Sequence, residues 1–537
     1  MRQRKSKMLS VLATAFAAAM PVTQALADPP VAPTVIDKPM HGVPVPRSFP
    51  DLVPYWNFDP PKSPLFDVSK FTLSGDMRVR AESRTNSNFA RQSADTFVQQ
   101  WARLGLNYAI SQDVDMFTQL QYSKNWGGNG TAALGNANDS SFQTNSNTTG
   151  TTDPRNNNSL LGVRQAFIII RNLGVDGLSL KVGRQLVVMG NHRLFGHFDW
   201  NNQAFSHDGV TFQYNQPTYE VWGGWLHAGN SDAQAAGAAN GAVTNAATSG
   251  GANADILFTR VAFKPMAGLA IEPLWVWQNN KNGTVSSTGT GAALNATNGF
   301  GVLTPHAAGQ SRHTLGGRVA YRQDMFDGTF ESYWQTGRFE QNNGQSLSIN
   351  AVAMAIEGGV TFKDLPMNPR LGAEFNYASG DGDGKACAQN GQAACNGNAN
   401  TFENLYPTNH IVMGYADRMA WRNMVGYSGS LQLNPTQQTH LETRFWVFRK
   451  ANNGDCWYTA SQVCQNAGVT TNNSLYKELD MIFTMFFKNN KVAWQTGGAY
   501  LWAGGAMDQM INAQGGAVSQ GGARNSAWGY TQLQVNF

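Results

Sequence analysis

Two histidine-bearing stretches hold the residue types that most often perform catalysis. GNHRLFGHFDW (190–200) contains His192, His197 and Asp199, and YPTNH (406–410) contains Asn409 and His410. A hydrolase needs a nucleophile within hydrogen-bond reach of its base. The sequence has no GxSxG turn and places no serine beside these histidines. An outer-membrane hydrolase is therefore only an alternative, and we predict no catalytic residue.

The four cysteines form two pairs with the same spacing. Seven residues separate Cys387 from Cys395, and seven separate Cys456 from Cys464. In an exported protein such pairs indicate local disulfides that stiffen loops, although four cysteines allow three connectivities. The wide spacing disfavours a zinc site, no CxxCH haem motif occurs, and the DGDG at 381–384 lacks the full EF-hand spacing. We predict no metal and no cofactor.

Charged residues alternate with apolar ones in many short stretches. In FTLSGDMRVRAESR (71–84) the apolar residues share one face of an extended chain and the charged residues the other. A charge that faces lipid costs about 2–4 kcal/mol near the bilayer midplane, so in membrane-crossing strands the charged face turns inward. The residues predicted to line the interior are Asp76, Arg78, Arg80, Glu82, Arg103, Arg164, Arg260, Glu272, Arg318, Arg322, Glu331, Glu357, Arg370, Glu374, Arg422, Glu442, Arg444, Glu478 and Asp480.

Two questions about these charges stay open. The side chains either brace the wall by pairing across strands or form a ladder that conducts anions. Leu180 and Val182 would put Arg184 on the lipid face, which predicts a bulge at Gly183 or a position above the bilayer. Tryptophans near strand ends are expected to form an interfacial girdle: Trp101, Trp225, Trp275, Trp277, Trp334, Trp502 and Trp528.

The elements that position these residues are short two-sided segments. Turns such as NQPT and KNN alternate with long loops along the chain, and no fixed repeat of a β-helix is found. This pattern predicts an all-β fold, a transmembrane antiparallel up-and-down β-barrel of about 18 strands with short periplasmic turns and long extracellular loops. The expected strands are 71–83, 97–110, 115–124, 160–171, 178–187, 206–214, 218–227, 254–264, 268–278, 311–322, 328–338, 346–362, 370–379, 421–433, 438–449, 475–487, 491–502 and 524–537.

Composition and the N-terminal region indicate export. Residues 1–27 read as a signal peptide with a basic start and an ALA cleavage site, and 28–70 as a proline-rich periplasmic lead before the barrel at 71–537. Removal of the signal peptide takes four positive charges from a net charge of +4, so strong attraction to nucleic acid is not expected. Only 14% of residues are charged, 11% are aromatic, and no apolar run is long enough for a spanning helix.

The last segment, WGYTQLQVNF (528–537), alternates in the same way and finishes on Phe537. We expect this strand to close the barrel against the first, because an unpaired strand edge in lipid is costly. An even strand number places both termini on the periplasmic side. The terminal Phe537 resembles the signature that the barrel-assembly machinery reads in bacterial outer-membrane proteins. These expectations place the protein in the bacterial outer membrane, in contact with its lipid.

Two stretches resemble the alginate-export family of outer-membrane porins. The first, at 181–210, carries GRQ at 183–185, GNHRL at 190–194, DW at 199–200 and DGV at 208–210. The second carries ASGD at 378–381, TF at 401–402, YPTNH at 406–410, Gly414, Asp417 and Asn423, and MRVRAES (77–83) is similar to the family's first strand. Asn191 and His207 depart from the usual pattern, and the cysteine-bearing loops look like additions.

The resemblance implies an eighteen-stranded barrel with an arginine-lined conduit, narrowed by inward-folded loops and used for passive export of an anionic polysaccharide. Loop 188–205 is the candidate constriction. We therefore expect a porin for hydrophilic, anionic solutes or polysaccharide, and the lead at 28–70 is a candidate docking segment for a periplasmic export component. The alternative is a barrel that sheaths a periplasmic partner such as a cytochrome electron conduit. The residues assigned to the constriction are Arg184, His192, Arg193, Asp199, Asp208, Asn409 and His410.

Overall fold

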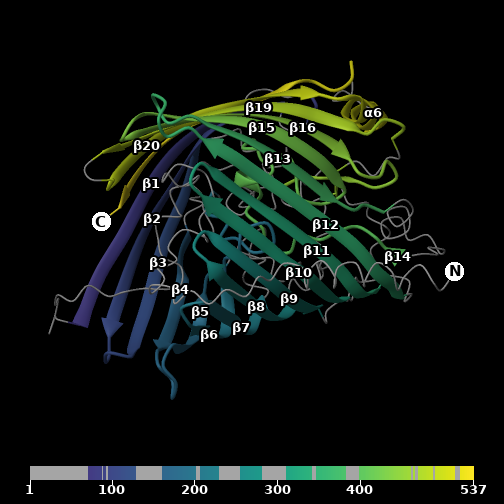
Figure 1. The fold of residues 1–537 in the computed structure, drawn as a ribbon. Coiled ribbons are helices and arrows are strands. Elements are labelled where there is room, and N and C mark those ends of the chain that lie inside the picture. The colour runs from purple at the N-terminus through teal and green to yellow at the C-terminus, as the bar shows by residue number, and fades with distance from the viewer. Residues whose placement is uncertain are drawn as a thin grey trace, which may run out of the picture. The chain divides into compact units, whose positions relative to one another are not determined.

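Eighteen long strands form one antiparallel wall that closes on itself (Figure 1). The computed structural model describes residues 70–86, 89–91, 95–127, 160–200, 206–228, 254–280, 310–340, 346–381, 398–460, 464–465, 470–487, 490–514 and 521–536. The wall strands are β1 (Phe71–Thr85), β2 (Asp95–Ala109), β3 (Val114–Gly127), β4 (Leu160–Ile170), β5 (Leu178–Gln185), β6 (His207–Asn215), β7 (Tyr219–Ala228), β8 (Ala254–Met266), β9 (Leu269–Asn280), β10 (Gln310–Gln323), β11 (Phe326–Glu340), β12 (Ser346–Thr361), β13 (Arg370–Ala378), β15 (Met424–Thr436), β16 (Thr439–Lys450), β19 (Ser474–Phe487), β20 (Val492–Ala503) and β21 (Ser526–Asn536).

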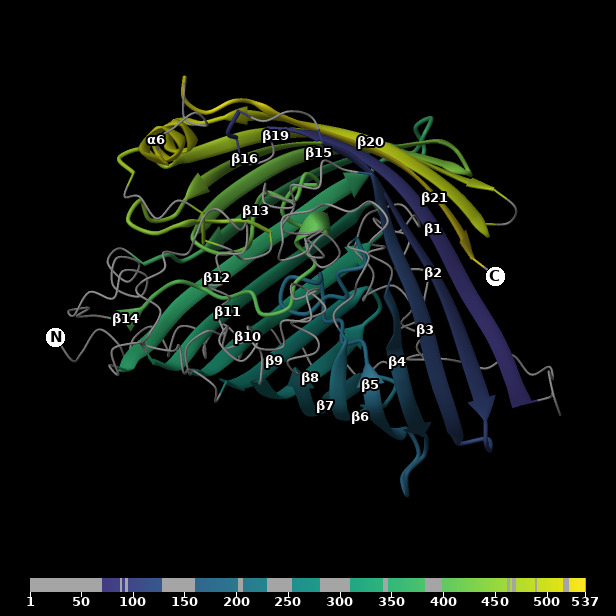
Figure 2. The ribbon, with the colours of Figure 1, turned by 180° about the vertical axis from the view of Figure 1, so that it is seen from behind.

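Each wall strand pairs with the next wall strand along the chain, and β1 pairs with β21 to close the circle. Arg80 lies opposite Gln532 at this seam, and Figure 2 shows the two strands side by side. The predicted fold class is confirmed. The predictions for the signal peptide, the lead up to residue 69, and Phe537 fall outside the described residues.

One predicted strand starts too early. The sequence places a strand from residue 421, but β15 begins at Met424. Asn423 has φ +43, a left-handed turn conformation that interrupts an extended backbone. Arg422 therefore belongs to the preceding segment and does not line a strand.

Short turns and long connections alternate as predicted. The turn between β8 and β9 has only two residues, and Gly268 adopts φ +79 there, where an added Cβ would lie only 2.0 Å from the carbonyl oxygen of Arg322. Only glycine fits this turn without strain. The connections at the opposite rim carry small elements: β14 (Asn398–Ala399), the 3-10 helix η4 (Asn409–Ile411), β17 (Trp457–Tyr458), β18 (Cys464–Gln465) and α6 (Gly505–Gln514). Over the described ranges, no helix is both long and apolar enough to cross a membrane.

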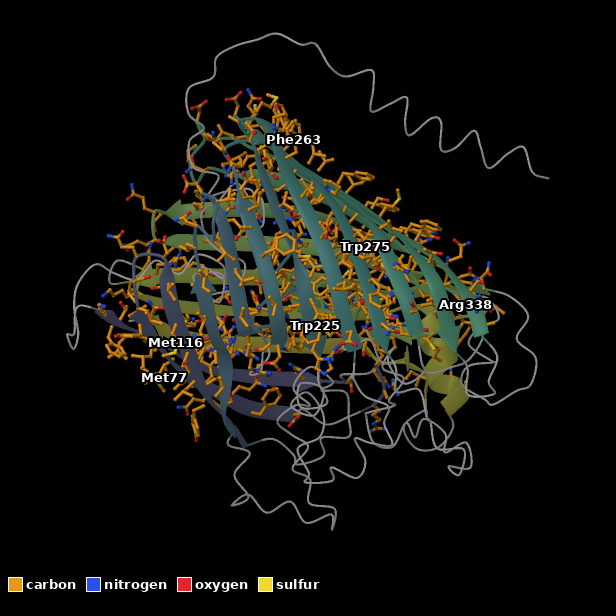
Figure 3. The ribbon with its side chains drawn as sticks, turned by 90° about the horizontal axis from the view of Figure 1, so that it is seen from below. Met77, Met116, Trp225, Phe263, Trp275 and Arg338 are labelled. Atoms are coloured by element: carbon orange, nitrogen blue, oxygen red, sulfur yellow. The ribbon has the colours of Figure 1, made fainter. Side chains whose placement is uncertain are left out.

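The two faces of the wall differ in chemistry. Outward residues are apolar and exposed, as Figure 3 shows for Met77, Met116, Trp225 and Phe263, which are 41–43% exposed. Their inward neighbours are polar and buried. This is the arrangement required of a barrel whose outer surface meets lipid.

Two tryptophans assigned to the outer girdle lie inside instead. Trp101 is 0% exposed and Trp528 is 4% exposed, whereas Trp225, Trp334 and Trp502 are exposed on the outside. The reason is strand parity: Trp101 shares the inward face of β2 with Arg103, and Trp528 shares that of β21 with Tyr530.

Two connections fold into the barrel. We call residues 186–200, which follow β5, the first lumenal segment, and residues 400–423, which precede β15, the second lumenal segment. Their apolar side chains, among them Phe195, Trp200, Tyr406 and Trp421, join inward residues of the wall in one buried core. The interior at this level is therefore packed by the chain itself.

Candidate functional site

The two lumenal segments are joined by backbone hydrogen bonds. The amide of Gly196 donates to the carbonyl of Tyr406, and the amide of Tyr406 donates to the carbonyl of Leu194, each at 2.8 Å. The amide of Thr408 donates to the carbonyl of His192 at 3.0 Å. These bonds make the segments one unit, because neither can move without exposing backbone groups of the other.

Gly196 is the tightest point of this unit. A Cβ at this position would lie 2.1 Å from Thr408 Oγ1 and 2.8 Å from its backbone nitrogen. We expect Gly196→Ala to separate the segments at a cost of about 1–3 kcal/mol. Faster amide hydrogen exchange at 194–198 and 404–408 would show it. Gly429→Ala is the matched control, since nothing lies within 4 Å of that Cβ, and equal exchange in both variants would contradict the prediction.

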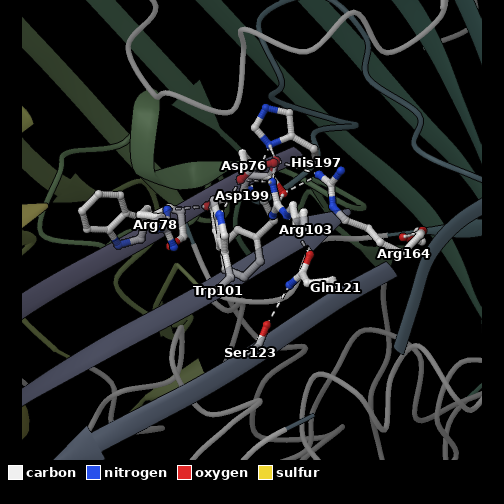
Figure 4. A network of polar contacts seen from close by, with 12 residues as sticks. Asp76, Arg78, Trp101, Arg103, Gln121, Ser123, Arg164, His197 and Asp199 are labelled. Carbon is white, nitrogen blue, oxygen red and sulfur yellow. Dashed lines mark hydrogen bonds and ion pairs between the residues drawn. The ribbon is translucent and has the colours of Figure 1, made fainter. Parts of the chain in front are cut away.

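Five buried arginines of β1, β2 and β4 form what we call the arginine group: Arg78, Arg80, Arg84, Arg103 and Arg164. Asp199 anchors the first lumenal segment to this group (Figure 4). Arg103 donates to both carboxylate oxygens at 3.1 Å, and Arg164 approaches both at 2.7 Å. Arg78 donates to the backbone carbonyls of Asp199 and Trp200 at 2.9 Å each. Three guanidinium groups from separate strands thus converge on one residue of the segment.

Aromatic rings hold these guanidinium groups in place. Arg78 and Arg103 both stack on Trp101, with their central carbons 3.3 and 3.7 Å from the ring centroid. Arg80 stacks on Trp200 at 3.6 Å. Cation–π contacts of this kind fix the orientation of an arginine while leaving its charge intact. The arginine group is therefore a buried cluster of positive charge that is held rigidly.

Arg193 anchors the same segment to the opposite side of the wall. It contacts carboxylates of three neighbouring strands: Glu374 closely, Glu331 at 3.6 Å and Glu357 at 3.8 Å. Nearby, Asn191 accepts a hydrogen bond from Arg318 at 2.7 Å and donates to Thr329 at 2.9 Å. The first lumenal segment thus spans the interior between a basic and an acidic part of the wall.

The electrostatics keep both anchors charged. Burial opposes ionisation of Asp199, but Arg103 and Arg164 outweigh it and hold the pKa of Asp199 well below its usual range. Burial likewise disfavours charge on Arg193, and Glu374, Glu331 and Glu357 outweigh it and raise the pKa of Arg193. Breaking either anchor therefore leaves buried charges without their partner.

His410 connects the second lumenal segment to the first. Its ring stacks on Trp200 with centroids 3.8 Å apart and an interplanar angle of 8°, and Asp417 Oδ2 lies 2.8 Å from Nδ1. Burial lowers the pKa of His410, although Asp417 acts in the opposite direction. The imidazole is therefore neutral at pH 7.

This lowered pKa predicts a loss of local stability in mild acid. The unfolded histidine takes up a proton near pH 6.5, whereas the folded one does so only at lower pH, so its contribution is complete above about pH 6.5 and is lost as the pH falls, by up to about 1.4 kcal/mol per pH unit. Hydrogen exchange of residues 406–417, corrected for the intrinsic rate, should rise from pH 7.5 to 5.5. His410→Gln should remove this pH dependence, and a dependence that persists in the variant would contradict the assignment.

Most other predicted interior residues are buried on the inward face. Within β1, Arg80 and Arg84 each lie 2.6 Å from Glu82. Across strands, Glu272 lies 2.8 Å from Arg260 and 2.7 Å from Arg318. The contacts of Glu272 join β8, β9 and β10, which is the bracing arrangement. Arg370 pairs with Asp327, and Arg444 pairs with Glu374. Arg322 is only partly buried. The other predicted interior residues that are buried are Asp76, Arg422, Glu442, Glu478 and Asp480.

Arg184 and Asp208 do not belong to the constriction. They face each other across β5 and β6, and their side chains form a salt bridge of 2.9 Å on the outward face, with 23% and 50% exposure. The pairing runs through Gly183 without a register shift, so the predicted bulge is absent. A neighbouring opposite charge near the strand end makes the outward position tolerable.

The remaining candidates lie in the two lumenal segments and in the connection that carries β17 and β18. His192 and His197 pack edge to face with centroids 4.9 Å apart, and Asn409 donates to the carbonyl of Ala460 at 2.6 Å. Cys456 is disulfide-bonded, and Cys464 lies opposite Tyr458 in the β17–β18 pair. Cys387 and Cys395 lie outside the described residues, so both local disulfide pairings stay predictions.

Sequence reasoning missed several residues that complete the site. Trp101 supports two arginines, Asp417 pairs with His410, and Glu403 lies 3.3 Å from Arg312. The alternation of residues along β2 could have identified Trp101 as an inward residue, since it is two residues from Arg103. The family resemblance includes Asp417 but gives it no role, and no local pattern marks Glu403, because it lies in irregular backbone.

Comparison with known proteins decides the family. The model of the family described as alginate export matches residues 69–519. The chain belongs to the alginate-export family. Together with the closed barrel, this membership makes the protein an outer-membrane barrel channel. No curated relative matches the sequence.

Solved structures share the fold of this alginate-export protein. OccAB2 of Acinetobacter baumannii has 9% identity and a TM-score of 0.53, covering 87% of this chain and 98% of its own. OccAB1 of the same species has 12% identity and a TM-score of 0.51, with coverage of 87% and 97%. OccK9 (OpdG) of Pseudomonas aeruginosa has 8% identity and a TM-score of 0.52, with coverage of 87% and 98%. These likenesses concern the fold alone.

Proposed function

We propose that this channel passes hydrophilic anionic solutes, or an anionic polysaccharide, without energy input, and that the two lumenal segments form its constriction. The observation that supports this proposal most strongly is the arginine group beside the first lumenal segment. Arg78, Arg80, Arg84, Arg103 and Arg164 face three carboxylates, those of Asp76, Glu82 and Asp199, which leaves an excess of two positive charges. Fixed positive charge close to the path of an ion attracts anions and repels cations.

The geometry supports permeation better than enzymatic turnover or partner binding. The arginine side chains are held by rings and backbone carbonyls, so they present charge without changing conformation. The buried core of the lumenal segments occupies part of the interior, which leaves less room for a sheathed periplasmic partner than for a small or linear solute. Channel function therefore accounts for the fixed charges, and a sheath does not.

Three further assignments belong to the same proposal. Both termini and the short turns lie at one rim, because the strand number is even, and this rim faces the periplasm. Phe537 is recognised by the barrel-assembly machinery, and the proline-rich lead at 28–70 docks a periplasmic export component. Deletion of Phe537 should reduce the amount of assembled barrel in the membrane, and deletion of 28–70 should leave the assembled amount unchanged while it reduces export.

The test of the transported charge is the reversal potential of the purified protein in a planar bilayer under a potassium chloride gradient. Anion selectivity is expected, since the arginine group carries the excess charge at the constriction. Addition of an anionic oligosaccharide should then block the chloride current, and a neutral oligosaccharide of equal length should block it less. Cation selectivity, or no conductance, would contradict the proposal.

A further inference from the structure

The outward face of β16 and β19 carries two cations close to the long-loop rim. Arg449 is the penultimate residue of β16, Lys477 is the fourth residue of β19, and both are exposed. Lys477 lies opposite Val447, two residues before Arg449 on the same face. The register shifts between Phe448 and Arg449, so Arg449 lies opposite Ser474, three residues before Lys477. Arginine and lysine have long side chains, so both can extend toward one headgroup between them.

This pair has no counter-charge on its own face. The carboxylates of the two strands, Glu442, Glu478 and Asp480, are all buried on the inward face. The side chains of Arg449 and Lys477 make no hydrogen bond or ion pair with any residue that the structure describes. The outward cation of β5 differs in this respect, because Asp208 neutralises Arg184 at 2.9 Å.

Exposed aromatic rings lie beside the pair toward the middle of the wall. Trp502 is directly opposite Lys477 in the β19–β20 pair. Its ring lies 4.9 Å from that of Tyr500 and 6.3 Å from that of Phe445, and all three side chains are 38–43% exposed. Rings of this type sit at the level where lipid chains meet headgroups, which places Arg449 and Lys477 at headgroup height.

We propose that Arg449 and Lys477 bind a phosphate group of an outer-leaflet lipid whose acyl chains pack on Phe445, Tyr500 and Trp502. The occupant we assign is lipid A, a glycolipid that carries phosphate on its sugars. Arginine contacts phosphate through two parallel hydrogen bonds and lysine contacts it as a point charge. The assignment rests on the outer-membrane location and is independent of the transported solute.

The charge and the position of Arg449 and Lys477 both favour binding of an anionic headgroup. A cation that faces lipid near the interface costs little, while each lysine or arginine near an anionic surface strengthens binding roughly fivefold. Two adjacent cations without a carboxylate therefore favour an anionic headgroup over a zwitterionic one. A single outward cation offers only half of this attraction.

The experiment measures lipid binding to the purified full-length barrel in non-ionic detergent, with bis-phosphorylated lipid A as the probe. The double variant Arg449→Gln with Lys477→Gln should bind about 30-fold more weakly, the effect of losing two such contacts. The matched control is Arg338→Gln, since Arg338 is exposed near the end of β11 (Figure 3), and no second lysine or arginine lies beside it on the described outward faces of β10 and β12. This control should change the affinity less than threefold.

Two further arms separate the sources of binding. Lipid A stripped of its phosphates should bind wild type and double variant equally, and inorganic phosphate alone should not compete at millimolar concentration. Equal affinity of wild type and double variant for the phosphorylated lipid, or an equal loss in the Arg338→Gln control, would overturn the proposal. Resistance of the unheated barrel to detergent unfolding checks that each variant is folded. Reversal potentials of the double variant should match wild type, so failure here is distinct from failure of the proposed channel function.

Discussion

Asp199→Asn is expected to raise the anion-to-cation permeability ratio about tenfold. The substitution removes one negative charge from beside Arg103 and Arg164 and keeps the shape of the side chain. The local excess of positive charge then rises from two to three. One unit charge about 8–10 Å from a permeating ion contributes roughly 1–2 kcal/mol at an effective dielectric constant of about 20–40, which corresponds to about a tenfold change in selectivity. The reversal potential under a potassium chloride gradient measures this change in the permeability ratio.

The matched control for this prediction is Asp208→Asn. Asp208 also pairs with an arginine, at 2.9 Å, but on the outward face of the wall. Its neutralisation should leave the reversal potential unchanged, because the pair is separated from the lumen. If both variants shift selectivity equally, or if neither does, the arginine group does not control permeation.

Arg193→Met is expected to release the first lumenal segment from the acidic part of the wall. The change removes the cation that Glu331, Glu357 and Glu374 share, and of the three Glu374 keeps Arg444 as a partner. Removing one partner of a buried charge group costs about 3–5 kcal/mol. Amide exchange at residues 190–198 should increase by two or more orders of magnitude, and single-channel conductance should rise as the segment leaves the lumen.

Arg370→Met separates this effect from general weakening of the wall. Arg370 is buried like Arg193 and pairs with Asp327 at 2.5 Å, but both residues are part of the wall near its short-turn rim. This control should lower the unfolding temperature of the barrel and leave exchange at 190–198 unchanged. Retained protection in Arg193→Met would show that the segment is held by its apolar core rather than by the carboxylates.

Glu82 and Asp199 illustrate how far local sequence reaches. Glu82 belongs to a strand whose alternation places it inside, and its partners Arg80 and Arg84 are two residues away on the same face. Both the position and the pairing could be read from the sequence. The partners of Asp199 are 96 and 35 residues away, and no local pattern encodes such separations.

The sequence by itself determined the wall of this alginate-export protein. A strand has a period of two residues, lipid tolerates no charge near the midplane, and turn residues mark the short rim, so strand number, order and facing follow from local rules. The errors there are also local: parity places Trp101 and Trp528 inside, and the backbone of Asn423 delays β15.

Only the tertiary structure decided what fills the wall. The lumenal segments have no periodic pattern, and their conformation depends on closing Gly196 against Thr408, on stacking Trp200 on His410, and on charges supplied by distant strands. The charges come from two separate groups of strands, β1, β2 and β4 in one and β11 to β13 in the other, and no local pattern relates them. The conformation of the lumenal segments is thus a consequence of three-dimensional packing, while the barrel around them follows from the alternation of single residues.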